Sequence, residues 1–234
     1  MASNYPTSLD SFTDPTSGSS LASPSHSGQH IDLNDAVEKL ETKLGIGSSA
    51  ASSATAGSVL VANGSGSTTW TATPYGLQFI KADTITSGAS KEITGVFSSS
   101  FTNYRIVISG LYINSRDVIN FRFGTTAAGY YGTLYYDEYT GSITGASRVN
   151  NGAGLYVGYG EGFSGGGTIS LDVGEPNTTN NRKMVHGTYY GGGFAGWAGG
   201  MVVNSTAYTS FTIYTNGGTT FLASNIVVYG YRKS

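Results

Sequence analysis

The side chains that could carry acid–base chemistry are sparse in this sequence. His186 is the one histidine after residue 77. The carboxylates of the same region are Asp83, Glu92, Asp117, Asp137, Glu138, Glu161, Asp172 and Glu175. Hydrolysis of a glycosidic bond needs two carboxylates flanking that bond. Asp137 and Glu138 are neighbours in a predicted strand and point to opposite faces, and Glu161 lies in a glycine-rich run typical of a solvated loop. We therefore predict no catalytic residue.

His26 and His30 are four residues apart, a spacing that brings two imidazoles together on a helix and can bind a metal ion. Pro24 and Gly28 argue against a helix at this point. One chain offers no third ligand, so a metal site would need symmetry-related copies. We expect these histidines to hydrogen-bond a docking partner or the start of a helix, and we predict no metal ion and no cofactor.

Aromatic residues set among glycines are the best candidates for ligand contact. They are Tyr189, Tyr190, Phe194 and Trp197 in residues 187–200, with Tyr156 and Tyr159 in residues 154–163. Aromatic rings can stack on the apolar faces of sugars, and glycine lets a ligand approach the backbone closely. We predict that these side chains contact a receptor from glycine-rich loops. The alternative is that they pack across subunit interfaces or into the core.

Short strands must position these residues, because residues 77–234 combine alternating apolar side chains with many glycine-rich turns. Tyr104, Ile106 and Ile108, for example, share one face of a strand. The predicted strands are 77–81, 91–97, 104–109, 118–123, 133–139, 168–173, 183–190, 208–215 and 225–232. Strands at this density predict a mainly β protein whose residues 77–234 form an antiparallel β-sandwich of the jelly-roll kind.

An extended arm and a linker are predicted before this domain. Residues 1–31 are rich in Ser, Thr, Pro and Gly and cannot bury enough apolar surface to fold alone. The isolated apolar residues that could anchor this arm to a larger assembly are Tyr5, Leu9, Phe12 and Leu21. Residues 47–76 are rich in Gly, Ser and Ala and are predicted to form a linker. Within it, Asn63-Gly64 should form the turn of a β-hairpin whose returning strand carries Trp70.

Residues 32–46 are predicted to form one short helix between the arm and the linker. Asp32 can cap its start and Gly45 can end it, and Asp35 can pair with Lys39. The apolar residues Leu33, Val37, Leu40 and Leu44 step by 4, 3 and 4 residues, as the core positions of a coiled coil do. A helix of this length is marginal alone. We predict that it joins copies of the chain; docking on its own domain is the alternative.

The overall composition excludes several classes of protein. Charged residues make up 11% of the 234 residues and the formal net charge is -2, so no basic field is available for nucleic acid or an anionic membrane. The chain has no cysteine for a disulfide framework and no apolar run long enough for a membrane helix. The first ten residues, MASNYPTSLD, do not read as a signal peptide, so we expect synthesis in the cytoplasm.

Parts of the sequence resemble a known class of proteins. Residues 23–26 (SPSH), 32–38 (DLNDAVE) and 43–45 (KLG) are similar to the N-terminal segment of tail-fibre and minor structural proteins of tailed bacteriophages. Residues 57–60 and 63–66 with Trp70 resemble a hairpin unit of phage fibre shafts, and residues 226–232 resemble the last strand of modules at fibre tips. Residues 124–224 resemble no known family, so the resemblance does not indicate which receptor the protein binds.

The resemblance implies a virion protein, usually a homotrimer, whose N-terminal arm docks on other virion proteins and whose C-terminal domain faces outward. We therefore expect a non-enzymatic tail fibre, made in the host cytoplasm and located in the phage particle, that binds a glycan of the host cell surface. Neither nucleic acid nor membrane insertion is expected. The alternatives are a capsid decoration or head-fibre protein, a tailspike enzyme that degrades polysaccharide, and a free lectin or adhesin.

Overall fold

The computed structural model describes residues 26–43, 54, 57–62, 68–72, 76–141, 144–160, 162, 166–191 and 193–232. The chain divides into two units, Met1–Pro74 and Tyr75–Ser234, and each is described by itself. The predicted anchors of the arm lie outside the described residues; they are Tyr5, Leu9, Phe12 and Leu21.

The helix of the first unit, α1 (His26–Lys43), begins earlier than predicted. The predicted start at Asp32 is wrong, because residues 26–31 are helical rather than part of an extended arm. Pro24 precedes the first helical residue, and proline is tolerated at the start of a helix. Gly28 costs only about 1 kcal/mol relative to alanine in a helix interior. Asp32 therefore lies inside the helix and is not its N-cap.

The apolar stripe of α1 is exposed in the single chain. Leu33, Val37 and Leu40 have exposed fractions of 56%, 45% and 46%. The predicted pair on the polar side forms, with Lys39 Nζ 3.2 Å from Asp35 Oδ2. Leu44, the last predicted residue of the stripe, lies outside the described residues. The rest of the stripe is thus open to contact with another chain.

Strands β1 (Ser58–Ala62) and β2 (Thr68–Ala72) form a two-stranded antiparallel sheet. Leu60 lies opposite Trp70, so Trp70 is on the returning strand as predicted. The proposed turn residues Asn63 and Gly64 lie outside the described residues.

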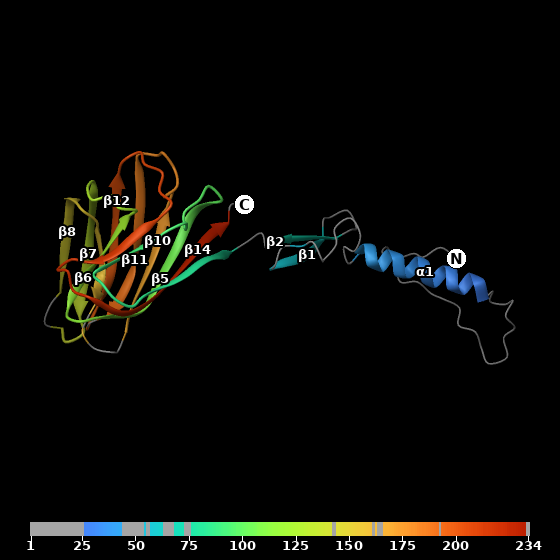
Figure 1. Ribbon diagram of the computed structural model, residues 1–234, viewed down its shortest axis with the longest axis horizontal. Helices are drawn as coiled ribbons and strands as arrows, with labels where there is room; N and C mark the ends of the chain where they lie inside the picture. Colours follow the sequence, from blue (N-terminus) through green and yellow to red (C-terminus); the bar gives the residue numbers. More distant parts are fainter. Residues whose placement is uncertain are drawn as a thin grey trace. The chain divides into compact units, whose positions relative to one another are not determined.

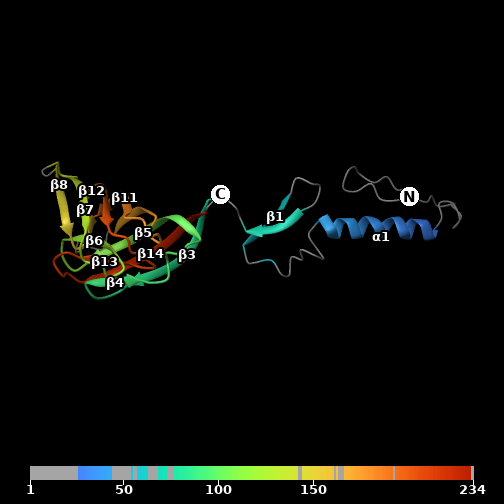
Figure 2. The same ribbon diagram turned by 90° about the horizontal axis from the view of Figure 1, so that it is seen from above.

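The second unit contains two antiparallel sheets, which Figures 1 and 2 show from two sides. The larger has the order β3-β14-β5-β10-β11-β12-β7-β8, and the smaller has the order β4-β13-β6-β9. The larger sheet consists of β3 (Leu77–Ile85), β14 (Phe221–Arg232), β5 (Phe101–Ile113), β10 (Gly167–Gly174), β11 (Arg182–Gly191), β12 (Phe194–Val203), β7 (Tyr130–Glu138) and β8 (Thr144–Gly152). The smaller consists of β4 (Ser90–Ile93), β13 (Phe211–Thr215), β6 (Asp117–Phe123) and β9 (Leu155–Gly160). The mainly β, antiparallel architecture is confirmed and is consistent with a β-sandwich.

The core of this unit contains a cluster of aromatic rings. Phe97, Tyr104, Phe121, Phe123 and Phe211 are each at most 2% exposed. The rings of Phe121 and Phe211 stack with their centroids 5.4 Å apart, and Phe97 meets Tyr104 edge to face at 4.8 Å. Each buried aromatic side chain removes a large apolar area from water. This burial stabilises the association of strands that lie far apart in the sequence.

Strands β9 and β12 lie in the glycine-rich runs that the sequence predicts as loops, and this prediction is wrong. A Cβ atom built on Gly200 or Gly132 would lie 2.5 or 2.8 Å from Leu155 Cδ2 on β9. On β9 itself, a Cβ on Gly158 would lie 3.0 Å from the ring of Tyr189. Glycine is needed at these inward positions because β9 approaches the larger sheet closely, not because the segments are loops.

Two predicted strands are shorter than the sequence suggests. β4 ends at Ile93 and β13 begins at Phe211. The N–H groups of Val96 and Phe97 both donate to Thr209 O, at 3.0 and 3.2 Å. Beyond the ends of β4 and β13, the two segments therefore stay hydrogen-bonded to each other, but not in the regular pattern of a β-ladder.

Lys183 is fully buried, at 0% exposure, although it lies on β11 beside exposed residues. Its ammonium group donates hydrogen bonds to Asn180 O at 2.5 Å and Asn204 O at 2.7 Å, and lies 5.9 Å from the centroid of the Tyr208 ring. Burial lowers the pKa of Lys183 relative to its ordinary value. The side chain thus connects two loops by satisfying their carbonyl groups, which is its structural role.

We predict that Lys183→Met lowers the free energy of unfolding by about 1–3 kcal/mol, because two carbonyl groups lose their charged donor. Arg182→Met is the matched control, since the neighbouring Arg182 is exposed and its loss should change stability by less than about 0.5 kcal/mol. Chemical denaturation followed by tryptophan fluorescence measures both. Equal stability of the two variants would contradict the role of Lys183.

Candidate functional site

The outward face of the larger sheet carries the candidate site. Burial alternates along β10, with Leu171 and Val173 in the core and Asp172 and Gly174 outward. Because neighbouring strands are in register, outward residues line up across the sheet. The site lies at the centre of the sheet, on β14, β5, β10, β11 and β12.

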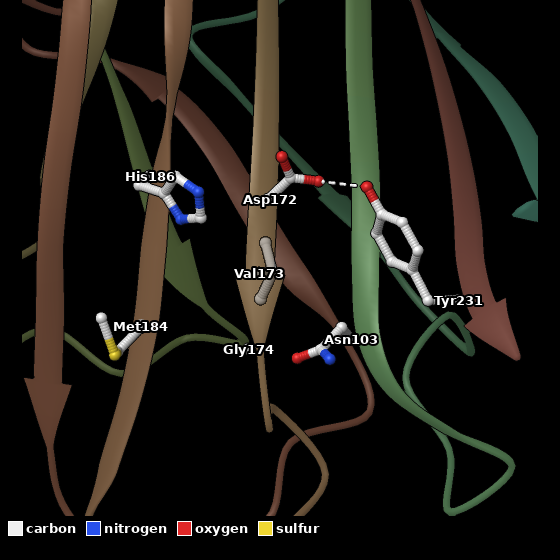
Figure 3. A pocket seen from close by; sticks show the side chains of 7 residues that line it. All are labelled: Asn103, Asp172, Val173, Gly174, Met184, His186 and Tyr231. Carbon is white, nitrogen blue, oxygen red and sulfur yellow. Dashed lines mark hydrogen bonds between the residues drawn. The ribbon is translucent and has the colours of Figure 1, made fainter. Parts of the chain in front are cut away.

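Asp172 is the centre of a polar cluster on this face. It lies opposite Arg105 on β5 and opposite His186 on β11. Arg105 binds its carboxylate with two hydrogen bonds, Nε to Oδ1 at 3.0 Å and Nη2 to Oδ2 at 2.6 Å. The hydroxyl of Tyr231 on β14 donates to Oδ1 at 2.8 Å (Figure 3). The carboxylate is therefore held in one orientation by groups from two other strands.

The charge of this cluster is stabilised despite partial burial. Burial alone would raise the pKa of the Asp172 carboxyl, but the hydrogen bonds from Arg105 and Tyr231 outweigh it and leave the pKa below its ordinary value. The hydrogen bond to Asp172 raises the pKa of Arg105. Burial, followed by the interaction with Asp172, raises the pKa of Tyr231. At neutral pH, Asp172 and Arg105 therefore form an ion pair with no net charge.

Two adjoining hollows flank this cluster. A hollow of about 420 Å³ lies over Gly174, between Asn103, Met184 and Tyr231. A second, of about 370 Å³, lies over Gly199, and both include Asp172 and His186 in their walls. Figure 3 shows the residues that line the first hollow, which lie on β5, β10, β11 and β14.

Glycine creates both hollows, because it leaves outward positions of the sheet without a side chain. A Cβ on Gly174 would lie 3.5 Å from Asn103 Oδ1, and one on Gly199 would lie 3.8 Å from Trp197 Cζ3. These are ordinary contact distances, unlike those at the inward glycines. The outward glycines are therefore not required by packing, and the space above them is available to a ligand.

An exposed aromatic surface borders the second hollow. Trp197 on β12 is 51% exposed and lies opposite Tyr135 on β7, which is 39% exposed. Their rings stack with centroids 6.0 Å apart and planes inclined by 16°. Tyr190, 58% exposed, lies on the same face of the neighbouring strand β11. The stacked pair is therefore partly exposed to solvent and adjoins the hollow that includes Asp172 and His186.

The predicted receptor-contact residues do not form one loop. Tyr190 and Trp197 are exposed on the outward face. Tyr189 and Phe194, by contrast, are 4% and 6% exposed and belong to the core. Strand alternation explains this, since neighbouring residues such as Tyr189 and Tyr190 point to opposite faces.

Tyr156 and Tyr159 lie on β9 and are partly buried against the core. The ring of Tyr159 lies 4.9 Å from that of Phe194. In the single chain, Tyr189, Phe194 and Tyr159 therefore serve packing, as the alternative interpretation allows. Tyr190 and Trp197 remain candidates for ligand contact.

The sequence interpretation considered Asp172 and His186 for acid–base chemistry only, and it gave no role to three further residues of this face: Tyr135, Arg105 and Tyr231. A signal exists for Arg105 and Asp172, because both are charged residues at outward positions of otherwise apolar strands. No local pattern reveals that they form a pair, since they are separated by 67 residues in sequence. Their contact depends on β5 and β10 being neighbours.

The chemistry of this face suits the binding of an uncharged, hydroxyl-rich molecule. The ion pair, the imidazole and the tyrosine hydroxyl offer both donors and acceptors, and the stacked rings offer an apolar surface. Within the described residues, no group of three His, Asp or Glu side chains comes together to hold a metal ion. Helix α1 lacks the length and apolarity needed to cross a membrane.

Comparisons with known proteins assign no family to the chain. No protein family matches the sequence, and no curated protein matches it. Among solved structures, a similarity is found to the crystal structure of the infectious bursal disease virus VP2 subviral particle. It has 10% sequence identity and a TM-score of 0.13, and it covers 73% of this chain and 45% of that chain. A likeness at this level carries no argument, so the resemblance to phage tail fibres stays a prediction.

We predict that Asp172→Asn lowers stability at pH 7 by about 1 kcal/mol, given the partial solvent exposure of the ion pair. The pKa of Asp172 in the folded state lies below the ordinary aspartate value of 3.8. Its stabilising effect is therefore complete above that value and is lost as pH falls through the folded-state pKa. Denaturation curves of the two proteins should differ at pH 7, and the difference should shrink as the pH falls below 3.8.

Asp137→Asn is the control for this experiment, because Asp137 is an exposed carboxylate on the same face of the sheet. Its loss should change stability little over this pH range. A stability difference between wild type and Asp172→Asn that stays constant as the pH falls below 3.8 would show that the ion pair is not its cause.

Proposed function

We propose that the outward face of the larger sheet binds a glycan of the host cell surface without modifying it. The observation that carries this proposal is the half-exposed Trp197, stacked on Tyr135 beside a hollow lined by Arg105, Asp172 and His186. A sugar ring has an apolar C–H face that suits an aromatic surface, and its hydroxyl groups need donors and acceptors close by. Both kinds of group occur here on one rigid sheet, which favours binding without a large loss of entropy.

The state of Asp172 favours binding over hydrolysis. Glycoside hydrolysis uses a pair of carboxyl groups, one of which must donate a proton. Among the described residues that line the two hollows, Asp172 is the one carboxylate, and its lowered pKa keeps it ionised at neutral pH. It is better suited to accept hydrogen bonds from hydroxyl groups. A tailspike enzyme therefore remains the less favoured function.

The strand order supports the interpretation of the second unit as an expanded jelly roll. In a jelly roll, strands labelled B to I in chain order form two four-stranded sheets, B-I-D-G and C-H-E-F. The order β4-β13-β6-β9 corresponds to the first sheet. The order β5-β10-β11-β12-β7-β8 corresponds to the second, with the pair β11 and β12 inserted between H and E. The inserted strands carry His186, Tyr190 and Trp197, so the insertion supplies much of the proposed binding face.

We further propose that α1 joins three copies of the chain. The exposed residues Leu33, Val37 and Leu40 follow the spacing of coiled-coil core positions. Three weak glycan sites on one particle bind much more tightly than one, since later contacts form at high effective concentration. Trimerisation would therefore make a shallow binding face effective.

The proposed setting is the particle of a tailed phage, with the protein as a tail fibre docked through its N-terminal arm. This part of the proposal is supported by the sequence resemblance alone, that is, by residues 23–45, by the hairpin segment with Trp70 and by residues 226–232. A capsid decoration or head fibre would use the same parts, and imaging of labelled protein on intact particles distinguishes the two.

We predict that Trp197→Ala weakens binding of the protein to host cells or their isolated surface glycan at least tenfold, because one stacking contact of about 1.5 kcal/mol is lost at each site. Thermal stability should change little, since Trp197 is half exposed. Gly199→Val should have the same effect on binding by filling the second hollow. Binding isotherms and melting curves of the same samples measure the two quantities.

Tyr139→Ala is the matched control, because Tyr139 is 86% exposed and lies beyond the end of β7. Its loss should leave binding unchanged. Equal binding by Trp197→Ala and wild type would overturn the proposed face. A collapse of the melting temperature in Trp197→Ala would instead show that Trp197 serves packing.

We predict that the double substitution Val37→Asp and Leu40→Asp converts a trimer into monomers, because carboxylates in the coiled-coil seam repel one another and lose water. Sedimentation velocity measures the mass, and circular dichroism should show an unchanged β signal from the second unit. Ile31→Asp is the control, since Ile31 is 66% exposed on the same helix but outside the seam. Equal trimer content in the double variant would contradict the role of α1.

A further inference from the structure

The coiled-coil seam of α1 continues through its two histidines. Counting back by heptads from Leu33 and Val37 gives His26 and His30, so the seam runs 26, 30, 33, 37, 40 in alternating steps of 4 and 3. Both histidines are helical and exposed in the single chain. The objection that Gly28 and Pro24 prevent a helix here no longer applies. In a parallel bundle, positions of this seam point to the shared axis, so both imidazoles of every copy would face it.

The two imidazoles already have a separation that suits a shared metal ion. Their Nε2 atoms lie 3.2 Å apart, and their rings meet edge to face with centroids at 4.6 Å. Metal–nitrogen bonds of about 2.0–2.1 Å place two ligands about 2.9 Å apart in octahedral geometry and about 3.4 Å apart in tetrahedral geometry. The observed separation falls between these values. Both side chains can therefore bind one ion after a small rotation.

A single chain cannot complete such a site. Two imidazoles are too few ligands, and within the described residues no third His, Asp or Glu joins them. Three copies around an axis would supply six imidazole nitrogens in two adjacent layers. The assembly would therefore complete the site, and binding of the ion would favour assembly by mass action.

We propose that His26 and His30 of three chains bind one divalent first-row transition ion, such as Ni²⁺, Co²⁺, Fe²⁺ or Zn²⁺, on the axis of the bundle. Neutral imidazole is a preferred ligand for these ions. The apolar layer at Leu33 adjoins the site on its C-terminal side and would limit access of water. The ion would hold the helices together at the end where the seam lacks apolar residues. This inference rests on the proposed trimer.

The test uses the full chain without a histidine tag, stripped with EDTA and then dialysed against Ni²⁺ or Zn²⁺. Elemental analysis should find about one bound ion per three chains. The variant His26→Gln, His30→Gln should retain less than a tenth of this amount. His186→Gln is the matched control, because His186 is the remaining histidine of the chain. This variant should bind the same amount of metal ion as the wild type.

Sedimentation velocity with and without EDTA separates this inference from the proposed trimer. A trimer that binds no ion, or binds it equally well in the double histidine variant, overturns the metal site and leaves the trimer standing. A monomer under both conditions overturns both. A trimer whose helix signal melts at higher temperature with Ni²⁺, and only when His26 and His30 are present, supports both.

Discussion

The close approach of β9 to the inner face of the larger sheet is the constraint on which the second unit depends. Leu155 sits against Gly132 and Gly200, where a Cβ atom would collide with it. Any larger residue there would push the two layers apart and open the core. The inward glycines Gly132, Gly158 and Gly200 on β7, β9 and β12 are therefore packing residues. Where a glycine must face inward, the residues on either side of it face outward, since side chains alternate along a strand.

The candidate binding face follows from the same alternation. Trp197 is outward because Ala198 is buried in the core, and Tyr190 is outward because Tyr189 is buried. The polar cluster connects neighbouring strands, because hydrogen bonds join Asp172 on β10 to Arg105 on β5 and to Tyr231 on β14. Flat strands hold these groups with little freedom, so a ligand would meet a preformed surface. Its shallow depth explains why several copies on one particle would be useful.

The first unit presents a different case, because the apolar stripe of its helix is exposed among the described residues. Leu33, Val37 and Leu40 are exposed, and α1 alone would be marginal in water. The sequence predicts a helix through Leu33, Val37 and Leu40 but not its start at His26, because Gly28 and Pro24 are poor helix formers. Local propensity is a weak guide when the penalty at one residue is small compared with the gain of extending a helix. Extension brought His26 and His30 into the seam.

The sequence by itself determined the mainly β class, most of the strands and the helical stripe, and it placed Trp197 and Tyr190 among six aromatic candidates for ligand contact. Those features depend on patterns over a few residues, which local sequence contains. Only the tertiary structure decided that residues 194–200 belong to a strand, that Tyr189 and Phe194 belong to the core, and that Asp172 meets Arg105 and Tyr231. These outcomes depend on which strands become neighbours. Strand pairing is set by contacts between distant segments, and no local pattern in one chain encodes it.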